Sequence, residues 1–541
     1  MTNLAIAMDL GTSGFRAQAL DLNTRKIIST AITTRHPLPG ANVIDHLHFA
    51  LEMSVDVAGS IMIEAINKVM ARLGVPLDKV VRIAVCGNPI QLSLFQRIEI
   101  RDLAYAGKRK LESLGVIPPK RDAKVLKAMD IQGLMICKDA EVIIPPAVRH
   151  EIGADALAMM IQTGMLDKDE TSLTTDYGTN AEMALYHDGK VITGSTAAGP
   201  ALEGQQISCG MLAMPGAISD LIDMERYDRV MVLDREMIPI TGPLLDLKNG
   251  RAIEDGLIEP LGITGTGTVA IVHEGIHKKL ISIPKINTLD GEFYLAPEIT
   301  FTEEDFKEAG KAIGSVRAGH ITLCHEAGID LEDVATAYMS GASGTYVDPL
   351  KAQTLGMIPP RVKTIFQVGN TSLAMARDLV LEPKKLDMMS DLAKNLRPTH
   401  CMFAASKVFE KVYILELSYW TEGMPFSQYQ KFLKKYGFPE LPTIEGTPEI
   451  VRTVRRDIDD LGELGLTTIS DIGQRVQAQI EGCIRCYECV NSCPEEALMI
   501  MEDAGSPTLV LDQSLCNGVA CRRCERVCPE KLFRLESFFI G

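Results

Sequence analysis

The crowding of cysteines near the C-terminus constrains this chain more than any other feature. Of 13 cysteines, eight lie between Cys483 and Cys528, and the other five are scattered through the first three-quarters of the sequence. In a chain without a secretion signal, thiols at this density indicate metal binding rather than a disulfide framework. We expect the scattered thiols to be reduced structural residues. They are Cys86, Cys137, Cys209, Cys324 and Cys401.

The spacing of the eight clustered cysteines predicts two 4Fe-4S clusters that carry electrons one at a time. Two runs, 483–494 and 516–529, end in Cys-Pro and follow the bacterial ferredoxin pattern, in which the fourth thiolate of a run binds the other run's cluster. The second run has four residues rather than two between its first pair of cysteines, which makes Cys516 the least regular ligand. Zinc is disfavoured, because a zinc module has no reason to repeat Cys-Pro. The predicted ligands are Cys483, Cys486, Cys489 and Cys528 for cluster I, and Cys493, Cys516, Cys521 and Cys524 for cluster II.

A second motif, D-x-G-T-[SN], occurs twice, at 9–13 and 176–180. In both places a glycine-containing turn separates two β-rich runs, which is typical of a β-hairpin. The predicted strands are 4–10 and 15–22 for the first hairpin, and 172–177 and 182–187 for the second.

A second repeated pattern favours an internal duplication. Two short apolar runs, 81–86 and 364–368, each end in Gly-Asn, and a predicted helix follows the second run at 372–381. Because both patterns recur in the same order, we expect two α/β halves that face each other across a cleft.

The two hairpins predict an ATP site. Backbone N–H groups and hydroxyls in such turns can hold phosphate oxygens, and the aspartate before the glycine can hold hydrated Mg²⁺ or orient an attacking water. A lone copy would be an ordinary turn, whereas the spaced pair, with two further glycine-containing turns, favours a nucleotide site. We predict Asp9 and Asp176 as catalytic residues, and Gly11, Thr12, Ser13, Gly178, Thr179, Asn180, Gly369 and Asn370 as nucleotide-binding residues.

At this point the chain resembles the fold shared by actin, sugar kinases and the seventy-kilodalton heat-shock chaperones. The resemblance implies a duplicated α/β ATPase whose two hairpins grip the phosphates. It also implies that a glycine-rich turn in the second half, placed at Gly341 to Gly344, contacts adenosine.

The remaining patterns divide the chain into four parts. A long insert in the second half contains a predicted helix at 303–327, and a charged, proline-containing connector contains another at 449–461. The predicted parts are 1–170, the first half of the ATPase fold; 171–425, the second half with the insert; 426–475, the connector; and 476–541, a small α+β ferredoxin-like domain.

Charge and hydropathy exclude other classes of protein. The 55 Lys+Arg against 71 Asp+Glu give a net charge of -16, which argues against a nucleic-acid partner. No uncharged stretch is long enough to span a membrane, and Asp9 interrupts the region where a signal peptide would be apolar. We therefore expect a soluble cytoplasmic protein.

An ATP site joined to a low-potential electron carrier suggests that hydrolysis drives an unfavourable electron transfer. For one electron, about 59 mV corresponds to a tenfold change in equilibrium, so hydrolysis could overcome a deficit of hundreds of millivolts.

The whole chain resembles the methylamine methyltransferase corrinoid protein reductive activases of methanogenic archaea. The matching segments are MDLGTSGFRAQALDL, DYGTNAEMAL, STAAGPALEGQQISCGMLAMPGAI, SGASGTYVDPLKAQTLGMIPP and VGNTSLAMARDLV, followed by the cysteine module.

This resemblance implies that the protein returns inactive Co(II) corrinoid proteins of methylamine methyltransferase systems to Co(I). Electrons from a low-potential donor would pass through the two clusters in a step that requires ATP with Mg. Related bacterial activators carry a 2Fe-2S domain before the ATPase fold, so the cluster module at the other end favours the archaeal type.

Three alternatives remain open. A small-molecule kinase leaves the eight cysteines unexplained, and the activators of 2-hydroxyacyl-CoA dehydratases are shorter and share one cluster across a dimer. An actin-like or chaperone-like scaffold is the non-enzymatic alternative.

The segment 197–218, with Glu203 and Cys209, is either a packing element or a sensor of nucleotide or partner. His46 and His48 are expected to be ordinary core or surface histidines rather than ligands of cobalt or another metal.

Overall fold

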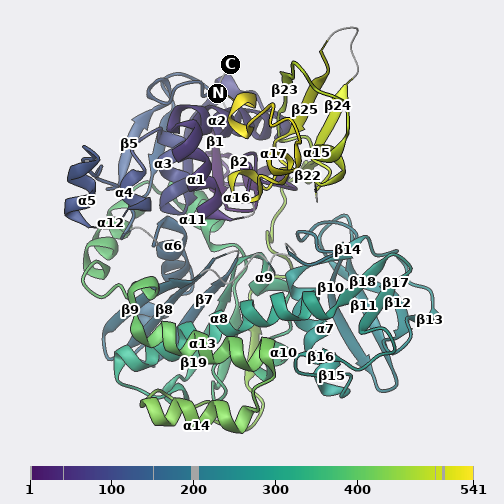
Figure 1. Cartoon of the computed structure of the whole chain (residues 1–541). Helices are drawn as coiled ribbons and strands as arrows, with labels where there is room; N and C mark the ends of the chain where they lie inside the picture. Colours follow the sequence, from purple (N-terminus) through teal and green to yellow (C-terminus); the bar gives the residue numbers. More distant parts are fainter. Residues whose placement is uncertain are drawn as a thin grey trace. The chain divides into compact units, whose positions relative to one another are not determined.

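The structure is a computed structural model that describes residues 3–539 except 41, 106, 150–151, 179, 197–200, 202–205, 494 and 502–505. Figure 1 shows the course of the chain. It divides into two compact units. The N-terminal unit contains residues 1–150, 376–390 and 461–541, and the central unit contains residues 151–375 and 391–460. In the described part of the chain, no helix is long and apolar enough to cross a membrane.

The N-terminal unit is built on a mixed sheet with the strand order β22-β3-β2-β1-β4-β6-β5. Strand β1 is buried along its whole length, as its apolar sequence LAIAMDL and central position require. It pairs antiparallel with β2 and parallel with β4. The strands are β1 (Leu4–Leu10), β2 (Phe15–Asp21), β3 (Ile27–Thr33), β4 (Val80–Gly87), β5 (Lys124–Lys127), β6 (Glu141–Ile144) and β22 (Leu466–Ile469).

Side-chain caps fix where two helices of this unit begin. The Asn42 side chain accepts hydrogen bonds from the first turn of α1, and Asn88 does the same for α3, where Pro89 occupies the first helical turn. The helices are α1 (Val43–Met53), α2 (Val55–Arg72), α3 (Pro89–Gln96), α4 (Arg101–Ala104) and α5 (Lys108–Ser113). Helices α11 (Thr371–Leu381) and α12 (Lys385–Leu396) contain residues of both units.

The cysteine module forms a small α+β domain within the N-terminal unit. Its antiparallel sheet has the order β23-β25-β24, and Leu498, Leu509, Leu511 and Phe533 contribute to its own core. Its elements are β23 (Arg475–Gln479), β24 (Leu498–Met501), β25 (Thr508–Asp512), α15 (Glu488–Asn491), α16 (Gly518–Cys521) and α17 (Arg523–Val527).

The central unit repeats the topology of the N-terminal sheet. Its main sheet has the order β21-β20-β19-β7-β8-β9, in which β7, β8 and β9 are antiparallel and β19, β20 and β21 run parallel to β7. The order β3-β2-β1-β4-β6 therefore matches β9-β8-β7-β19-β20, and the predicted duplicated fold is confirmed. The strands are β7 (Ser172–Tyr177), β8 (Ala181–His187), β9 (Lys190–Thr196), β19 (Thr336–Ser340), β20 (Thr364–Gln367) and β21 (Glu449–Arg452).

The shared Gly-Asn pattern does not mark equivalent strands. Strand β4 lies beside β1, and its counterpart beside β7 is β19, whereas β20 corresponds to β6. Both asparagines instead cap the helix that follows: Asn88 Oδ1 accepts from the Gln91 N–H (3.0 Å), and Asn370 Oδ1 accepts from the Leu373 N–H (2.7 Å). The pattern therefore reflects helix capping after a parallel strand and not the duplication.

The long insert of the central unit has a sheet of its own, ordered β13-β12-β11-β10-β14. Its strands are β10 (Ala217–Met224), β11 (Tyr227–Leu233), β12 (Pro239–Asp246), β13 (Arg251–Glu254) and β14 (Gly262–Ile263). Two short ribbons follow, β15 (Ile281–Ser282) with β16 (Lys285–Ile286), and β17 (Glu292–Ala296) with β18 (Ile299–Thr302).

Helix α8 (Glu303–Ala327) lies where the sequence predicts a helix. Thr302 and Asp305 form a capping box at its start, and Gly328, at φ +72°, ends it. It packs along α13 through small residues: a Cβ on Gly310 would lie 2.7 Å from Trp420 Cβ. The other helices of the unit are α6 (Ala154–Gln162), α7 (Gly265–His277), α9 (Gly341–Tyr346), α10 (Pro349–Thr354), α13 (Lys407–Glu422) and α14 (Phe426–Tyr436).

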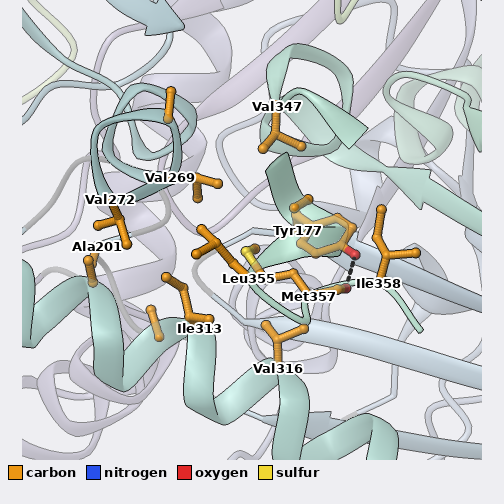
Figure 2. Close-up of a cluster of buried hydrophobic side chains, with 14 of the residues drawn as sticks. Tyr177, Ala201, Val269, Val272, Ile313, Val316, Val347, Leu355, Met357 and Ile358 are labelled. Atoms are coloured by element: carbon orange, nitrogen blue, oxygen red, sulfur yellow. Dashed lines mark hydrogen bonds between the residues drawn. The ribbon is translucent and has the colours of Figure 1, made fainter. Parts of the chain in front are cut away.

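The core of the central unit reaches the second hairpin through Tyr177, at the end of β7. Figure 2 shows its ring among Leu355, Ile358 and Val316, with the hydroxyl donating to the Met357 carbonyl (2.7 Å). The residue between Asp176 and Gly178 is therefore held by packing, which fixes the position of the turn.

Two local predictions are wrong. Residues 449–461 do not form a helix; they begin with strand β21 (Glu449–Arg452), which pairs parallel with β20. The β-branched pair Ile450-Val451 suits an edge strand, and the following residues bend. The glycine-rich segment from Gly341 to Gly344 is the start of helix α9 rather than a free turn.

Candidate functional site

The first hairpin places Asp9 beside its turn and beside the end of β4. Asp9 is only 6% exposed, and in the hairpin register it lies opposite Arg16, whose Nη1 is 3.7 Å from Asp9 Oδ2. The Thr12 hydroxyl accepts a hydrogen bond from Asn88 Nδ2 (3.2 Å). The Phe15 N–H, just after the turn, donates to Thr33 Oγ1 (2.8 Å). Of the predicted residues here, Gly11, Thr12 and Ser13 form the turn and Asp9 precedes it.

The second hairpin brings Asp176 together with the ends of two parallel strands. Ser340 Oγ donates to Asp176 Oδ2 (3.1 Å). A Cβ on Gly341 would lie 2.4 Å from Asp176 Oδ1, and its φ of +80° also favours glycine. The Gly341 N–H donates to the Gly369 carbonyl (3.0 Å). Asp176, Gly341 and Gly369 therefore meet at the carboxyl edge of β7, β19 and β20, the edge at which ligands bind in parallel sheets.

The remaining predicted nucleotide residues lie around this edge. The Gly178 N–H donates to the Asn180 carbonyl across the turn (3.2 Å), and Thr179 lies outside the described residues. The Asn370 N–H donates to the Asp457 carbonyl (3.1 Å). A Cβ on Gly344 would lie 3.1 Å from the Met339 carbonyl carbon, so this glycine packs α9 against β19.

One residue of this edge, Glu182 on β8, was not identified from the sequence. It lies directly opposite Asp176 in the hairpin register and is 6% exposed. Burial raises the pKa of its carboxyl well above the usual value, and the nearby carboxylates of Asp155 and Asp176 raise it further. The equivalent position opposite Asp9 holds Arg16, so a basic side chain in the first hairpin corresponds to an acidic one in the second. The hairpin register could have revealed this pair.

The structure sorts the eight clustered cysteines into two sets of four. Cys483, Cys486, Cys489 and Cys528 line one cavity, which we name the cluster I cavity. Cys493, Cys516, Cys521 and Cys524 line a second, the cluster II cavity. These are the sets that the ferredoxin pattern predicts.

The donors and walls of both cavities suit iron–sulfur clusters. Apolar residues such as Leu509 and Leu511 line them, and two sulfur atoms accept backbone hydrogen bonds, Cys493 Sγ from the Ala497 N–H (3.3 Å) and Cys516 Sγ from the Gly518 N–H (3.2 Å). Burial raises the pKa of the Cys516 thiol to about 12. A thiolate at this position would therefore need a neighbouring positive charge, which iron would supply.

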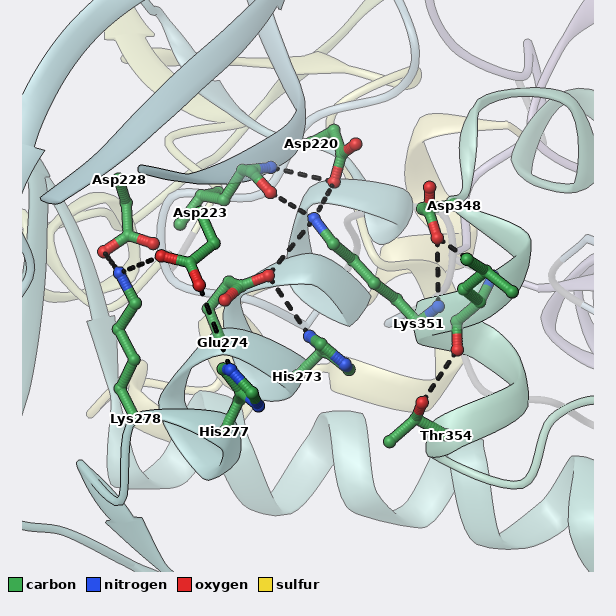
Figure 3. A network of polar contacts seen from close by, with 12 residues as sticks. Asp220, Asp223, Asp228, His273, Glu274, His277, Lys278, Asp348, Lys351 and Thr354 are labelled. Carbon is green, nitrogen blue, oxygen red and sulfur yellow. Dashed lines mark hydrogen bonds and ion pairs between the residues drawn. The ribbon is translucent and has the colours of Figure 1, made fainter. Parts of the chain in front are cut away.

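An acidic cluster in the insert is occupied by lysines rather than suited to a metal. Asp223, Asp228 and Glu274 lie close enough to share one ion. Figure 3 shows that Lys278 Nζ instead lies 2.9 Å from Asp223 and 2.8 Å from Asp228, and that Lys351 Nζ lies 3.4 Å from Glu274. These ammonium groups balance the carboxylates, so the network ties β10, β11, α7 and α10 together.

The other residues weighed from the sequence have structural surroundings. His46 is fully buried and His48 is exposed, as expected for core and surface histidines. In the segment 197–218, Cys209 Sγ contacts the Glu298 carbonyl at 3.6 Å, whereas Glu203 lies outside the described residues.

Three family models match the chain in sequence order. The model described as "RACo middle region" matches residues 4–168. The model described as "C-terminal domain of RACo the ASKHA domain" matches residues 170–430, and a "4Fe-4S dicluster domain" matches residues 482–532. The iron–sulfur module and the ATPase-type fold are thereby supported independently of the geometry.

Two related proteins and one solved structure carry names that refer to the reduction or activation of corrinoid proteins. The chain is 50% identical over 516 residues, or 95% of both chains, to "[Co(II) methylated amine-specific corrinoid protein] reductase" of Methanosarcina barkeri. It is 24% identical to "Corrinoid activation enzyme RamQ" of Eubacterium limosum, over 76% of this chain and 69% of that one. The solved "Reductive activator for corrinoid,iron-sulfur protein" shares the fold, with a TM-score of 0.65 and 23% identity over 77% of this chain and 66% of that one. The predicted resemblance is confirmed, and the chain belongs to the family of reductive activators of corrinoid proteins.

Proposed function

We propose that this protein reduces Co(II) to Co(I) in corrinoid proteins of methylamine methyltransferase systems, in a step that requires Mg-ATP. Each cobalt gains one electron, and a low-potential donor is oxidised by the same amount. The observation that carries the proposal is one chain with a duplicated pair of phosphate-type hairpins and two four-cysteine cavities. The 50% identity to a methylated-amine-specific reductase supports the choice of partner.

The nucleotide would be held by the two turns. Backbone N–H groups at Gly11 to Ser13 and at Asn180 would bind phosphate oxygens, with the Thr12 hydroxyl adding a donor. Asp9 and Asp176 would hold hydrated Mg²⁺ or orient the attacking water. Glu182 supports a cation-binding role of the second hairpin. A cation bound beside Asp176 would stabilise the ionised form of the buried Glu182 carboxyl.

The cluster module would receive and pass the electron. When bound, two 4Fe-4S clusters supply reversible one-electron carriers of low potential. The eight cysteines would hold them in the two sets that line the two cavities. The backbone N–H groups that donate to Cys493 and Cys516 would tune the reduction potential of cluster II by stabilising negative charge on sulfur. Reduced thiols in such number also suit a cytoplasmic location.

The test is cobalt reduction by the full-length protein after anaerobic cluster assembly. A Co(II) methylamine-pathway corrinoid protein, titanium(III) citrate as reductant and Mg-ATP are mixed, and Co(I) is followed by its absorbance. We expect Co(I) only with ATP. Asp176→Asn keeps the shape of the side chain but removes its charge, so ATP hydrolysis should fall by about 100-fold or more while both clusters remain reducible.

Two outcomes would refute the proposal. One is equal Co(I) formation with and without ATP. The other is unchanged ATP hydrolysis in both Asp9→Asn and Asp176→Asn, which would remove the hairpins from the site.

A further inference from the structure

Three buried polar side chains of the N-terminal unit have no part in the proposed chemistry. His36 is 4% exposed, and His46 and Gln91 are 0% exposed. The two imidazole rings stack with centroids 3.9 Å apart, and Gln91 bonds both, His36 Nε2 at 3.1 Å and His46 Nδ1 at 2.8 Å. Burying three such groups is costly unless their hydrogen bonds are made. The bonds to Gln91 meet part of this cost, whereas His46 Nε2 is buried without a hydrogen-bond partner among the described residues. We call these three residues the bridge.

The hydrogen bonds of the bridge fit a single orientation. Burial lowers the pKa of His46 to about 3 and that of His36 well below its usual value, so both rings are neutral near pH 7. His36 Nδ1 accepts from the Leu38 N–H (3.1 Å), which leaves Nε2 as the donor to the Gln91 oxygen. The Gln91 amide then donates to His46 Nδ1. The direction of each bond therefore depends on the next one.

One end of the bridge reaches the first phosphate turn. Asn88 Oδ1 accepts from the backbone N–H of Gln91 (3.0 Å), and Asn88 Nδ2 donates to the Thr12 hydroxyl (3.2 Å). On the other side, the His36 ring meets the ring of Phe15, the residue after the turn, edge to face at 5.1 Å. The Thr12 hydroxyl can accept from Asn88 and still donate its own hydrogen to a phosphate oxygen, so phosphate and Asn88 would contact the same oxygen atom.

The other end reaches the loop that lines the cluster II cavity. The chain between His36 and His46 passes Gly40, whose N–H donates to the Cys516 carbonyl (2.9 Å). Pro39 lies against Gly518, where a Cβ would be 3.2 Å from Pro39 Cβ, and the Gly518 N–H in turn donates to Cys516 Sγ (3.2 Å). Helix α1, which carries His46, packs on α16 of the cluster module (Figure 1).

Further contacts hold this junction together. Arg522, which lines the cluster II cavity, forms an ion pair with Glu52 of α1. The Phe49 ring meets the Phe539 ring edge to face at 4.9 Å. The first turn and the cluster II loop are therefore joined through a series of buried and partly exposed contacts within one compact unit.

We propose that the bridge, with Gln91 at its centre, is a positioning element that couples nucleotide binding at the first turn to the environment of cluster II. The inference rests on the proposed sites for ATP and for the cluster. If nucleotide changes the cluster II loop, linkage requires that the redox state of the cluster change nucleotide affinity by the same factor.

The test compares nucleotide affinity in two redox states. The full-length protein, with both clusters assembled, is titrated with the non-hydrolysable analogue AMPPNP and Mg²⁺ when oxidised and after dithionite reduction. EPR-monitored titrations of both clusters, with and without AMPPNP, give the reciprocal measurement. We expect affinities that differ about fivefold or more between redox states, the lower range of typical couplings, and a ratio near one in Gln91→Met.

Gln18→Met is the matched control, because Gln18 is also a buried glutamine of this unit and donates to Thr30 Oγ1 (3.0 Å), apart from the bridge. It should keep the wild-type ratio. An unchanged ratio in Gln91→Met with full iron content would overturn the proposal.

Hydrogen exchange of the wild-type protein provides a readout that does not depend on a variant folding. AMPPNP should change protection in peptides that cover 36–46 and 516–522. Unchanged protection in either of the two peptides, with AMPPNP bound and Co(I) still formed, would refute the coupling. The proposed function would then still stand. Failure to bind AMPPNP or to assemble clusters would refute both.

Discussion

The raised pKa of Glu182 predicts that nucleotide binding releases a proton. In the nucleotide-free protein, desolvation and the carboxylates of Asp155 and Asp176 raise the pKa of this buried carboxyl well above its usual value, so it stays neutral up to a higher pH than an exposed glutamate does. A divalent cation at Asp176 favours the ionised form, so Glu182 should lose its proton when Mg-nucleotide binds. One released proton makes the affinity rise about tenfold per pH unit, or about 1.4 kcal/mol, below the pKa of the group.

The sign of the stability change follows from the same shift. The folded-state pKa of Glu182 lies above the unfolded value of about 4.3. The neutral carboxyl therefore does not destabilise the folded protein at low pH. The nucleotide-free fold is destabilised as pH rises from that value to the raised pKa, and Mg-nucleotide should relieve the loss. Unfolding midpoints with and without ligand should therefore diverge as pH increases.

The assay is calorimetric titration of AMPPNP with saturating Mg²⁺ in two buffers of different ionisation enthalpy, from pH 6 to pH 8. We expect proton release in the wild type that decreases as pH rises through the raised pKa of Glu182, and none attributable to this site in Glu182→Gln. Asp188→Asn, in the exposed turn between β8 and β9, is the control and should behave as the wild type. Equal proton release in Glu182→Gln and the wild type would show that Glu182 does not titrate on binding.

The remaining predictions concern the clusters and a buried ion pair. Cys528→Ala and Cys524→Ala should each lose one cluster, which leaves about four irons and different surviving EPR signals, and identical signals would contradict the two ligand sets. Glu416→Gln leaves the buried charge of Arg317, 3.1 Å away, without its partner and should lower the unfolding free energy by about 3–5 kcal/mol. The double variant Arg317→Met with Glu416→Gln should recover most of that loss in denaturant unfolding, because no lone charge remains and the amide oxygen can still accept from Tyr429.

The predictions from sequence succeed where the signal is local. The hairpins follow from glycine turns between apolar runs, and β1, β7 and α8 lie at the predicted residues. The grouping of the cysteines follows from spacing that a small ferredoxin core enforces. The four-part domain division remains a prediction.

The failures depend on pairing between distant segments. Strand β21 is short and becomes a strand only because the edge of β20 accepts it, which the local pattern at 449–461 does not reveal. Glu182 becomes noteworthy only when the register sets it against Asp176. Of the two histidines of the bridge, the sequence analysis considers only His46, and its stacking on His36 depends on α1 meeting the loop that follows β3.

The position of β22 has a practical consequence for engineering this protein. Before the cysteine module begins, the chain adds β22 to the sheet of the N-terminal unit, parallel to β3. The segment that leads into the cysteine module is therefore fixed by strand pairing and is not a flexible linker. A truncation placed before Leu466 would expose the edge of β3 and invite aggregation, whereas one after Ile469 would keep that edge covered. Exchange of cluster modules between relatives should accordingly join the two sequences after β22.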